Sequence, residues 1–442
     1  MTSRHATSLT NGEIVEENDL GSIRRVTADS LPILSGMSIK RIVLNPGAMR
    51  TPHWHANANE LTYCVLGTSV VSVLDTYSKF SSFTVGAGEM FHIDSGSLHH
   101  IENIGENAAE FILAFRSERP EDFGLAAAFG AMTDAVLGNT YDLPASDFAK
   151  IRRDTTDRRL AGRAGDPDVP STAQFNDPHK FAVEAQSPPI GIAVGSARLV
   201  RLQFWPALKD LSMYSLRIRE DGMREPHWHP ITAEMGYVHT GSARMTVMDP
   251  DGTRDTWYLK EGDVYFIPRA YPHHIEVVDA PDLHFAIFFD QPTPGDIGYR
   301  ASASAYSREV LAATFNMHVD DLPNFPLRRP TRSSSPAPTP STNTRWANSR
   351  SRHRREGIHT GTIRTRRARD RPRRETLPAQ RHIQRRSHAC ASRQCCTDWQ
   401  RNSSEPSGWC SAAAAAQCSP PSSCPTGHRS ESVSSESRSR SA

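Results

Sequence analysis

Two short segments of the chain carry the same pair of histidines around a tryptophan. His53-Trp54-His55 recurs as His227-Trp228-His229, 174 positions later. Because side chains alternate along a β-strand, residues two apart point to the same face, so the two histidines of each segment share one face. Two imidazoles on one face can bind the same metal ion, and both segments are therefore the first candidates for chemistry.

Each histidine pair is followed by a glutamate and then by a third histidine. Three histidines and one glutamate leave open positions on a six-coordinate ion, an arrangement that suits Mn²⁺ or Fe²⁺. A structural zinc ion instead prefers a closed tetrahedron that often contains thiolate. The sequence therefore predicts one divalent metal in each repeat. The predicted ligands are His53, His55, Glu60 and His99 in the first repeat and His227, His229, Glu234 and His273 in the second.

An arginine precedes each set of ligands. Arg50 and Arg224 lie three positions before the first metal histidine of their repeat. The planar guanidinium group suits a carboxylate, and a small dianion would need a metal and a cation close together. A surface salt bridge is the alternative for either arginine, but the presence of both favours substrate binding.

The same offset extends well beyond the histidines, over about 50 residues. The matching pairs are Arg50 and Arg224, Pro52 and Pro226, Glu60 and Glu234, Gly67 and Gly241, Gly88 and Gly262, and His99 and His273. One matching pair could arise by chance, but a constant offset over this length indicates tandem duplication of a whole domain.

Within each repeat, short apolar runs alternate with turn residues such as glycine, proline, aspartate and asparagine. Many short, evenly spaced strands of this kind predict an antiparallel sandwich or barrel. A helical stretch follows each repeat, at 122–137 and 307–317. We expect a first barrel with its helical appendage at 10–150, a linker at 151–180 and a second barrel with its appendage at 181–327.

The remaining residues, 328–442, form a tail of different composition. They hold 23 of the 51 basic residues, all arginine, and 7 of the 49 acidic residues, so the tail carries a net charge of about +16. The other 28 basic and 42 acidic residues give the body about −14. The tail, rich in serine, arginine and proline, is predicted to be disordered. The acidic body argues against nucleic acid as a partner, because phosphate contacts need a basic surface.

Cysteine usage and the N-terminus bear on the compartment. Cys64 is the one cysteine before the tail, so the body uses no disulfides, as is typical of a reducing compartment. The segment from Met1 to Leu20 has no apolar stretch after a basic start, and no apolar run of the sequence approaches the length of a membrane-spanning helix. We therefore expect a cytoplasmic protein with no secretory signal and no membrane partner.

The ligand spacing resembles the two sequence motifs of the cupin superfamily. The segment from Gly47 to Gly67 matches the first motif at every fixed position, and 88–103 resembles the second motif, with Asp94 where proline is usual. The second repeat departs from the motifs in turns and not at ligands, at Asp221, Ala270 and Val277. The resemblance implies an all-β fold: two tandem cupin barrels of the double-stranded β-helix (jelly-roll) type with short helical appendages, plus a disordered C-terminal tail.

Within that superfamily, 47–55 and 222–230 resemble the site strand of the bicupin oxalate decarboxylases, and the resemblance covers roughly positions 10–325. It implies a lyase that converts oxalate to formate and carbon dioxide, with one Mn²⁺ per barrel, Fe²⁺ as second choice, and O₂ as a cosubstrate. Oxalate would bind the metal beside Arg50 or Arg224. The first site is favoured as the catalytic one by family analogy alone, and a homo-oligomer is a further expectation.

One part of the family pattern is missing. In the family, a lid loop after the first barrel carries a carboxylate that supplies a proton, usually within a Ser-Glu-Asn-Ser run. The corresponding segment here is 115–123, where Glu118 or Glu121 could act as the general acid. An exposed charged loop is the alternative.

Because of this departure, two other functions stay open. The first is another cupin enzyme, such as an oxalate oxidase or a metal-dependent oxygenase or cyclase with a larger substrate. The second is a non-catalytic bicupin that binds a metal or a ligand. The volume of the cavity would separate the first alternative from a decarboxylase, because oxalate needs a small closed cavity.

Overall fold

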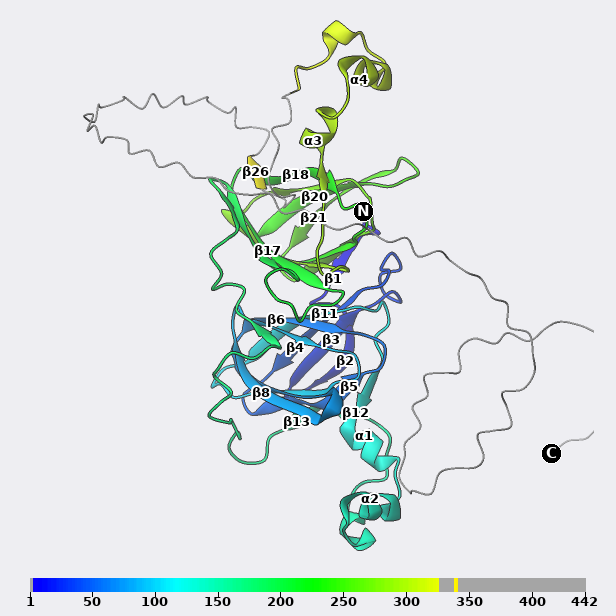
Figure 1. Ribbon diagram of the computed structural model, residues 1–442, viewed down its shortest axis with the longest axis vertical. Coiled ribbons are helices and arrows are strands. Elements are labelled where there is room, and N and C mark those ends of the chain that lie inside the picture. The colour runs from blue at the N-terminus through cyan, green and yellow to red at the C-terminus, as the bar shows by residue number, and fades with distance from the viewer. Residues whose placement is uncertain (1–2, 326–337, 341–442) are drawn as a thin grey trace, which may run out of the picture. The chain divides into compact units, whose positions relative to one another are not determined.

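The computed structural model describes residues 3–325 and 338–340, and it consists mainly of antiparallel β-sheets (Figure 1). The first barrel is built from two sheets, with strand orders β14-β9-β6-β11-β4-β3-β2 and β12-β5-β10-β7-β8, and β13 pairs with β5 at the edge of the second sheet. Its own strands are β2 (Glu13–Asn18), β3 (Gly21–Val26), β4 (Ser38–Leu44), β5 (Ala48–His55), β6 (Glu60–Leu66), β7 (Thr68–Asp75), β8 (Lys79–Gly86), β9 (Met90–Ile93), β10 (Leu98–Asn103), β11 (Ala109–Phe115), β12 (Asp122–Gly124) and β13 (Leu160–Gly162), with a short 3₁₀ turn, η1 (Thr76–Ser78), between β7 and β8.

The second barrel repeats this plan. Its sheets have the orders β1-β22-β19-β24-β17-β16-β15 and β21-β20-β23-β18-β25, with β26 beside β18. Its own strands are β15 (Ile190–Ile192), β16 (Gly195–Val200), β17 (Ser212–Arg219), β18 (Gly222–Trp228), β19 (Glu234–Thr240), β20 (Ser242–Met248), β21 (Arg254–Lys260), β22 (Asp263–Ile267), β23 (His273–Val277), β24 (Asp282–Phe289), β25 (Ile297–Gly298) and β26 (Pro338–Pro340). The predicted all-β fold of two tandem barrels is confirmed.

Side chains alternate along the strands, and those on the inner face fill the interior of each barrel. In the first, Phe83, Phe91 and Phe111 belong to a buried cluster between the two sheets, and Tyr265 and Phe285 belong to the matching cluster of the second. Aromatic and β-branched side chains on one face of a strand pack well on a pleated surface, which is why these segments form strands. Each barrel therefore has a core of its own, and the ligands lie at its inner wall.

The two barrels exchange one strand each. β1 (Ala6–Ser8) precedes the first barrel but pairs with β22 of the second, and β14 (Lys180–Phe181) precedes the second barrel but pairs with β9 of the first. A third apolar cluster, which includes Met37 and Tyr63 from one barrel and Met235 and Phe288 from the other, joins the two seven-stranded sheets. The exchange could not be predicted from local patterns, because it pairs residues far apart in the sequence.

Short helices follow each barrel: α1 (Leu125–Gly130), α2 (Asp134–Tyr141) and η2 (Ala145–Phe148) after the first, and α3 (Tyr299–Ala303), α4 (Arg308–Phe315) and η3 (Val319–Asp321) after the second. Thr133 and Ser307 cap α2 and α4 by accepting hydrogen bonds from Val136 and Val310 backbone nitrogens. The predicted helix at 122–137 begins later than expected, because 122–124 pairs with β5 as strand β12. No helix within the described residues is long and apolar enough to cross a membrane.

Two segments outside the predicted barrels also pair with them. β13, within the predicted linker, lies beside Ala48–Arg50 of β5, and β26, within the predicted tail, lies beside Gly222–Arg224 of β18. Proline cannot donate to a sheet ladder, but it is tolerated at an edge, which is where both prolines of β26 lie. The rest of the predicted disordered tail, like the six tail cysteines, lies outside the described residues.

Candidate metal centres

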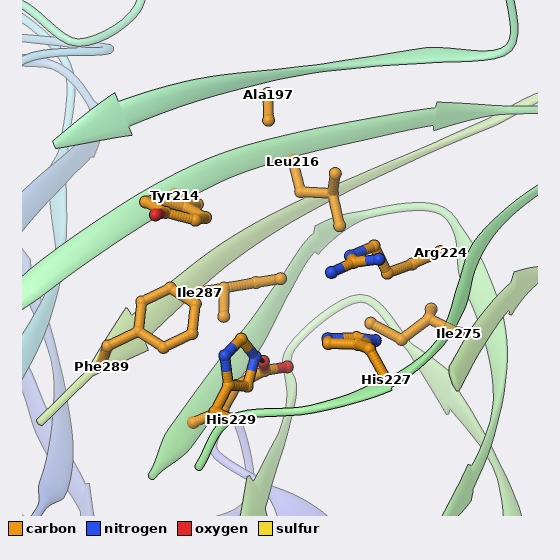
Figure 2. A pocket seen from close by; sticks show the side chains of 10 residues that line it. Ala197, Tyr214, Leu216, Arg224, His227, His229, Ile275, Ile287 and Phe289 are labelled. Carbon is orange, nitrogen blue, oxygen red and sulfur yellow. Dashed lines mark hydrogen bonds and ion pairs between the residues drawn. The ribbon is translucent and has the colours of Figure 1, made fainter. Parts of the chain in front are cut away.

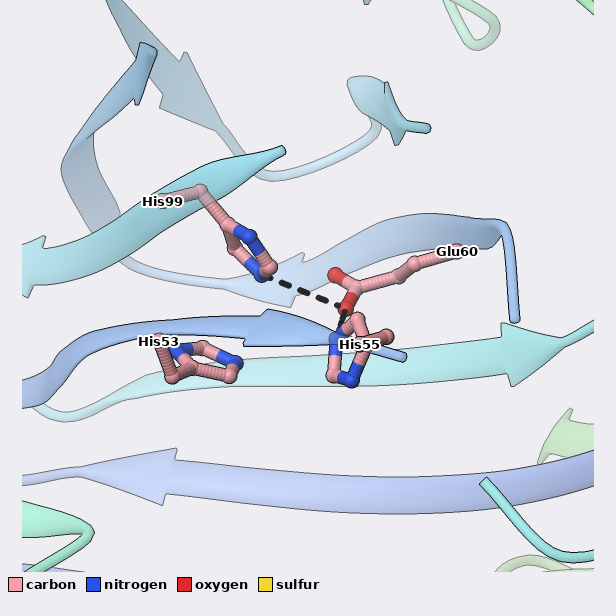
Figure 3. Close-up of side chains that lie close together, drawn as sticks. All are labelled: His53, His55, Glu60 and His99. Carbon is pink, nitrogen blue, oxygen red and sulfur yellow. Dashed lines mark hydrogen bonds and ion pairs between the residues drawn. The ribbon is translucent and has the colours of Figure 1, made fainter. Parts of the chain in front are cut away.

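The four predicted ligands of the first barrel converge on one point. His53 and His55 come from β5, Glu60 begins β6, and His99 lies on β10 (Figure 3). His99 is directly opposite His53 in the β5–β10 ladder, and the ligand atoms of all four residues lie within 4.8 Å of one another. All four side chains are buried.

The far side of each imidazole ring is anchored. The Nδ1 atoms of His53 and His99 lie 2.8 Å from the Thr51 carbonyl oxygen and 2.9 Å from the Ser97 carbonyl oxygen. A carbonyl oxygen can only accept, so Nδ1 carries the hydrogen and Nε2 keeps its lone pair for a metal. His55 is anchored differently, because its Nδ1 lies 2.7 Å from Oδ1 of Asp122.

Glu60 completes the set and carries the negative charge. Its Oε2 lies 2.7 Å from His55 Nε2 and 3.6 Å from His99 Nε2, and its Oε1 accepts a hydrogen bond from Thr62 Oγ1. His99 Nε2 is buried and has no hydrogen-bond partner among the described residues. A buried polar atom without a partner is costly, and a cation bound here would satisfy it together with the carboxylate. The residues therefore fit a divalent metal.

The second barrel builds the same centre. His227 lies on β18, His229 follows that strand, Glu234 begins β19 and His273 begins β23, and their ligand atoms also lie within 4.8 Å of one another. Each Nδ1 faces a backbone carbonyl oxygen: Glu225 for His227 at 2.8 Å, Gly295 for His229 at 2.9 Å and Tyr271 for His273 at 2.9 Å. Glu234 accepts a hydrogen bond from the Tyr265 hydroxyl, and His273 Nε2 has no partner among the described residues.

Burial and charge set the protonation of both centres in the way that a metal needs. Burial, aided by the neighbouring arginine, holds the pKa of His53 and of His227 well below the ordinary value of 6.5. Burial alone would raise the pKa of Glu60 and Glu234, but the adjacent histidines hold it below 4.5. The imidazoles of His53 and His227 are thus neutral and the two carboxylates ionised, as metal ligands must be. One metal per barrel follows from this donor set.

Both predicted arginines lie beside the ligands, and each is paired with an aspartate that the sequence analysis did not identify. Arg50 Nη2 lies 3.2 Å from Asp122 Oδ2, and Arg224 pairs with Asp296. Both arginines are buried, with 2% and 3% of their surface exposed. The two aspartates are separated by the same offset as the metal ligands, so extending the repeat comparison beyond the motifs would have found them.

The first cavity holds a second buried cation. Lys40 on β4 lines it together with Arg50, Asp122 and three of the four ligands, and its Nζ lies 2.9 and 3.2 Å from the two carboxylate oxygens of Asp122. Burial would raise the pKa of Asp122, but Lys40 and then His55 hold it well below its ordinary value. The empty space at this site, part of it open to solvent, is about 250 Å³.

The second cavity has a tyrosine in place of that lysine. Tyr214, Leu216, Arg224 and Phe289 line it together with three of the four ligands (Figure 2), and its empty space, part of it open to solvent, is about 320 Å³. The Tyr214 hydroxyl is buried and has no hydrogen-bond partner among the described residues. Burial raises the pKa of Tyr214 to about 12, so this wall of the cavity is uncharged.

The structure does not bring the two predicted lid acids to the cavity. The Glu118 carboxylate accepts a hydrogen bond from the Gly36 backbone nitrogen at 2.8 Å, and Glu121 is exposed. Neither lines the first cavity, whereas Asp122, next in sequence to Glu121, does. The reason is the short strand β12, which places Asp122 directly opposite His55.

Comparisons with known proteins match both repeats of the chain. A protein-family model described as Cupin matches residues 8–147 and 184–321. The chain is similar to the oxalate decarboxylase OxdC of Bacillus subtilis (strain 168), at 29% identity over 282 residues that cover 61% of this chain and 71% of that protein. It is also similar to a probable oxalate decarboxylase of Arthroderma benhamiae, at 26% identity over 318 residues that cover 68% and 76%.

Solved structures agree on the fold. A structure of oxalate decarboxylase from Bacillus subtilis aligns with a TM-score of 0.66 and 23% identity, and the alignment covers 77% of this chain and 88% of that one. The likeness therefore extends over both barrels and not over one alone.

Proposed function

The chain belongs to the cupin family, and from this premise we propose that it is a metal-dependent bicupin enzyme that decarboxylates oxalate to formate and carbon dioxide. The proposal depends mainly on one observation: buried Arg50 lines the same small cavity as three of the four metal ligands of its barrel. Its curated relatives include oxalate decarboxylases, which supports the same substrate.

The size and charge of the first cavity support a small carboxylate. Its empty space of about 250 Å³ includes open solvent, so the enclosed part of the cavity is smaller still. The fork of Arg50 can donate two parallel hydrogen bonds to one carboxylate. This favours oxalate over the larger substrates of an oxygenase or cyclase.

The chemistry assigns a task to each group. When bound, the metal would stabilise negative charge on the substrate and orient it. Arg50 would hold one carboxylate, Asp122 keeps His55 and Arg50 in position, and the apolar side chains of Leu113 and Phe115 in the wall limit the access of water. We propose Mn²⁺ as the metal in each barrel, because three nitrogens and one oxygen leave open positions on a six-coordinate ion, with Fe²⁺ as second choice.

The overall reaction also needs a proton. When the C–C bond of the oxalate dianion breaks, one carbon leaves as carbon dioxide, and the other gains one proton to become formate, with no net oxidation. O₂ would therefore assist as a cosubstrate without being consumed. Glu118 or Glu121 remains a proposed donor only if the loop moves, because Glu118 is held by Gly36 in this structure.

The position of these acids favours one second candidate, an oxalate oxidase. Without a proton donor at the cavity, no carbon would be protonated, both carbons of oxalate would leave as carbon dioxide, and their two electrons, with two protons from water, would reduce O₂ to hydrogen peroxide. Oxalate turnover by the manganese-loaded full chain, with formate and peroxide both assayed, separates the two reactions. Formate as the main product supports the decarboxylase, peroxide supports the oxidase, and neither product ends the oxalate proposal.

A further inference from the structure

We propose that Lys40 makes the first cavity a site for doubly charged carboxylates, whereas the second cavity, with Tyr214 in the same place, binds singly charged ones. This inference rests on the proposed function, because it assumes that small carboxylates enter both cavities. Lys40 is thus proposed as the residue that determines specificity, and the two barrels are expected to bind different ligands.

Lys40 and Tyr214 occupy equivalent positions. Lys40 on β4 is opposite Leu113 of β11, and Tyr214 on β17 is opposite Ile287 of β24. Tyr214 and Ile287 lie 174 positions after Lys40 and Leu113, which is the same offset that relates the metal ligands of the two barrels. Each side chain also meets the equivalent phenylalanine: Lys40 Nζ lies 4.5 Å from the Phe115 ring centre, and the Tyr214 ring lies 4.9 Å from the Phe289 ring.

The simpler explanation is that Lys40 exists only to pair with Asp122. The second barrel tests this explanation, because its equivalent carboxylate, Asp296, is paired with Arg224 and has Tyr214 where a lysine would be. A buried aspartate at this position is therefore accommodated by one arginine. The second cation in the first barrel exceeds what the aspartate needs and is available to a ligand.

The buried charges of the two cavities differ by one. In the first, Lys40 and Arg50 balance Glu60 and Asp122, and a divalent metal would leave a charge of two. In the second, Arg224 faces two carboxylates, Glu234 and Asp296, and a divalent metal would leave a charge of one. A buried charge that is not compensated is costly. A dianion such as oxalate therefore neutralises the first cavity, and a monoanion neutralises the second.

Further charged groups lie near both cavities. Arg159 is half-buried and lines the first, and Asp157, of opposite sign, acts on Arg50. Near the second, Glu225 acts on Arg224 and is itself close to Arg300, and Arg201 acts on Tyr214. The comparison therefore concerns the buried groups at the centres, where the exchange of lysine for tyrosine is the difference.

The experiment compares oxalate with oxamate, which has nearly the same shape and one negative charge fewer. Calorimetric titrations under nitrogen would use the manganese-loaded full chain, with metal content measured for each protein. Lys40→Met should weaken oxalate binding about tenfold to a hundredfold, as expected for a lost hydrogen bond between charged groups, and should change oxamate binding less than twofold. Lys40→Arg should keep most of the oxalate affinity.

A reciprocal variant covers the case in which Lys40→Met fails to fold or to hold metal. Tyr214→Lys should raise the oxalate affinity of the second site, and Tyr214→Phe is its matched control. Unchanged oxalate binding in a fully loaded Lys40→Met protein would overturn the inference, as would a Tyr214→Lys protein no better than its control. Wild-type protein that prefers oxalate to oxamate but turns neither over would end the decarboxylase proposal and leave the Lys40 inference standing.

Discussion

The two barrels agree at their metal centres and differ in the walls around them. Both centres use three histidines with anchored Nδ1 atoms and one glutamate. In the first barrel, His55 is anchored by the Asp122 side chain, whereas in the second His229 is anchored by the Gly295 backbone. Duplication has thus kept the ligands while the surrounding strands diverged, so metal binding is shared and substrate handling is where the barrels can differ.

The sharpest test of that comparison removes one ligand from each barrel. His99→Ala and His273→Ala should each lower the metal content from two ions per chain to one. If the first barrel carries the reaction, His99→Ala should lower oxalate turnover about a thousandfold or more, because metal catalysis is lost, and His273→Ala should retain most of it. Elemental analysis and formate release measure the two effects. Equal loss of turnover in both variants would contradict a division of labour.

The arginines are the next test. Arg50→Lys keeps the charge but loses the planar fork, so kcat/KM for oxalate should fall about a hundredfold, while Arg224→Lys should have a much smaller effect. Metal content should stay at the wild-type value in both variants, which controls for damage to the centre. Steady-state kinetics at several oxalate concentrations would show the loss, and a stronger effect of Arg224→Lys would reverse the assignment of the barrels.

Acid should affect both barrels alike. The pKa of His53 and of His227 is lower in the folded chain than the ordinary 6.5, so the unfolded chain binds more protons as the pH falls below that value. Above about pH 6.5 the metal-free protein therefore keeps the full contribution of these histidines to its stability. Below that pH, its free energy of unfolding should fall by about 1.4 kcal/mol per pH unit for each histidine. Thermal unfolding between pH 7 and pH 4.5 measures this loss, and a flat profile would argue against neutral buried histidines.

Metal release gives the matching comparison. Because protons compete with the metal for Nε2, both ions should leave over the same pH range. Two separate steps in metal content would show that the shared ligands do not make the two centres equivalent.

The sequence alone predicted the parts of the site that depend on spacing within one strand pair. His53 and His55 share a strand face, and the repeat located Glu60 and His99 with them. Lys40 could not be found in this way, because the second repeat has tyrosine in its place and β4 meets the centre only after the barrel closes. Asp122 does recur as Asp296, and it was missed because the repeat comparison ended at the motifs. Exchange of β1 and β14 between the barrels was also missed, because strands as short as these have little local signal.

Asp122 offers a further effect, on stability, that separates the barrels. Asp122→Asn leaves two buried cations, Lys40 and Arg50, without a counter-charge, and Asp296→Asn leaves only Arg224. Breaking a buried ion pair typically costs about 3–5 kcal/mol. We expect Asp122→Asn to reach that range and Asp296→Asn to fall below it, as measured by denaturant unfolding of the metal-free proteins. Adding Lys40→Met to Asp122→Asn should recover part of the loss, and no recovery would mean that the two side chains do not interact.

The smallest expected effect concerns the edge strands β13 and β26, which lie beside equivalent parts of β5 and β18. Leu160 of β13 is fully buried in the first core, so Leu160→Ala should destabilise the chain by about 2–3 kcal/mol. β26 has proline at two of its three positions and can form few ladder hydrogen bonds, so a chain ending at residue 327 should lose less than about 1 kcal/mol relative to one ending at residue 341. Thermal unfolding of the three proteins measures this order. A larger loss on truncation would mean that the second barrel depends on its C-terminal segment as strongly as the first depends on β13.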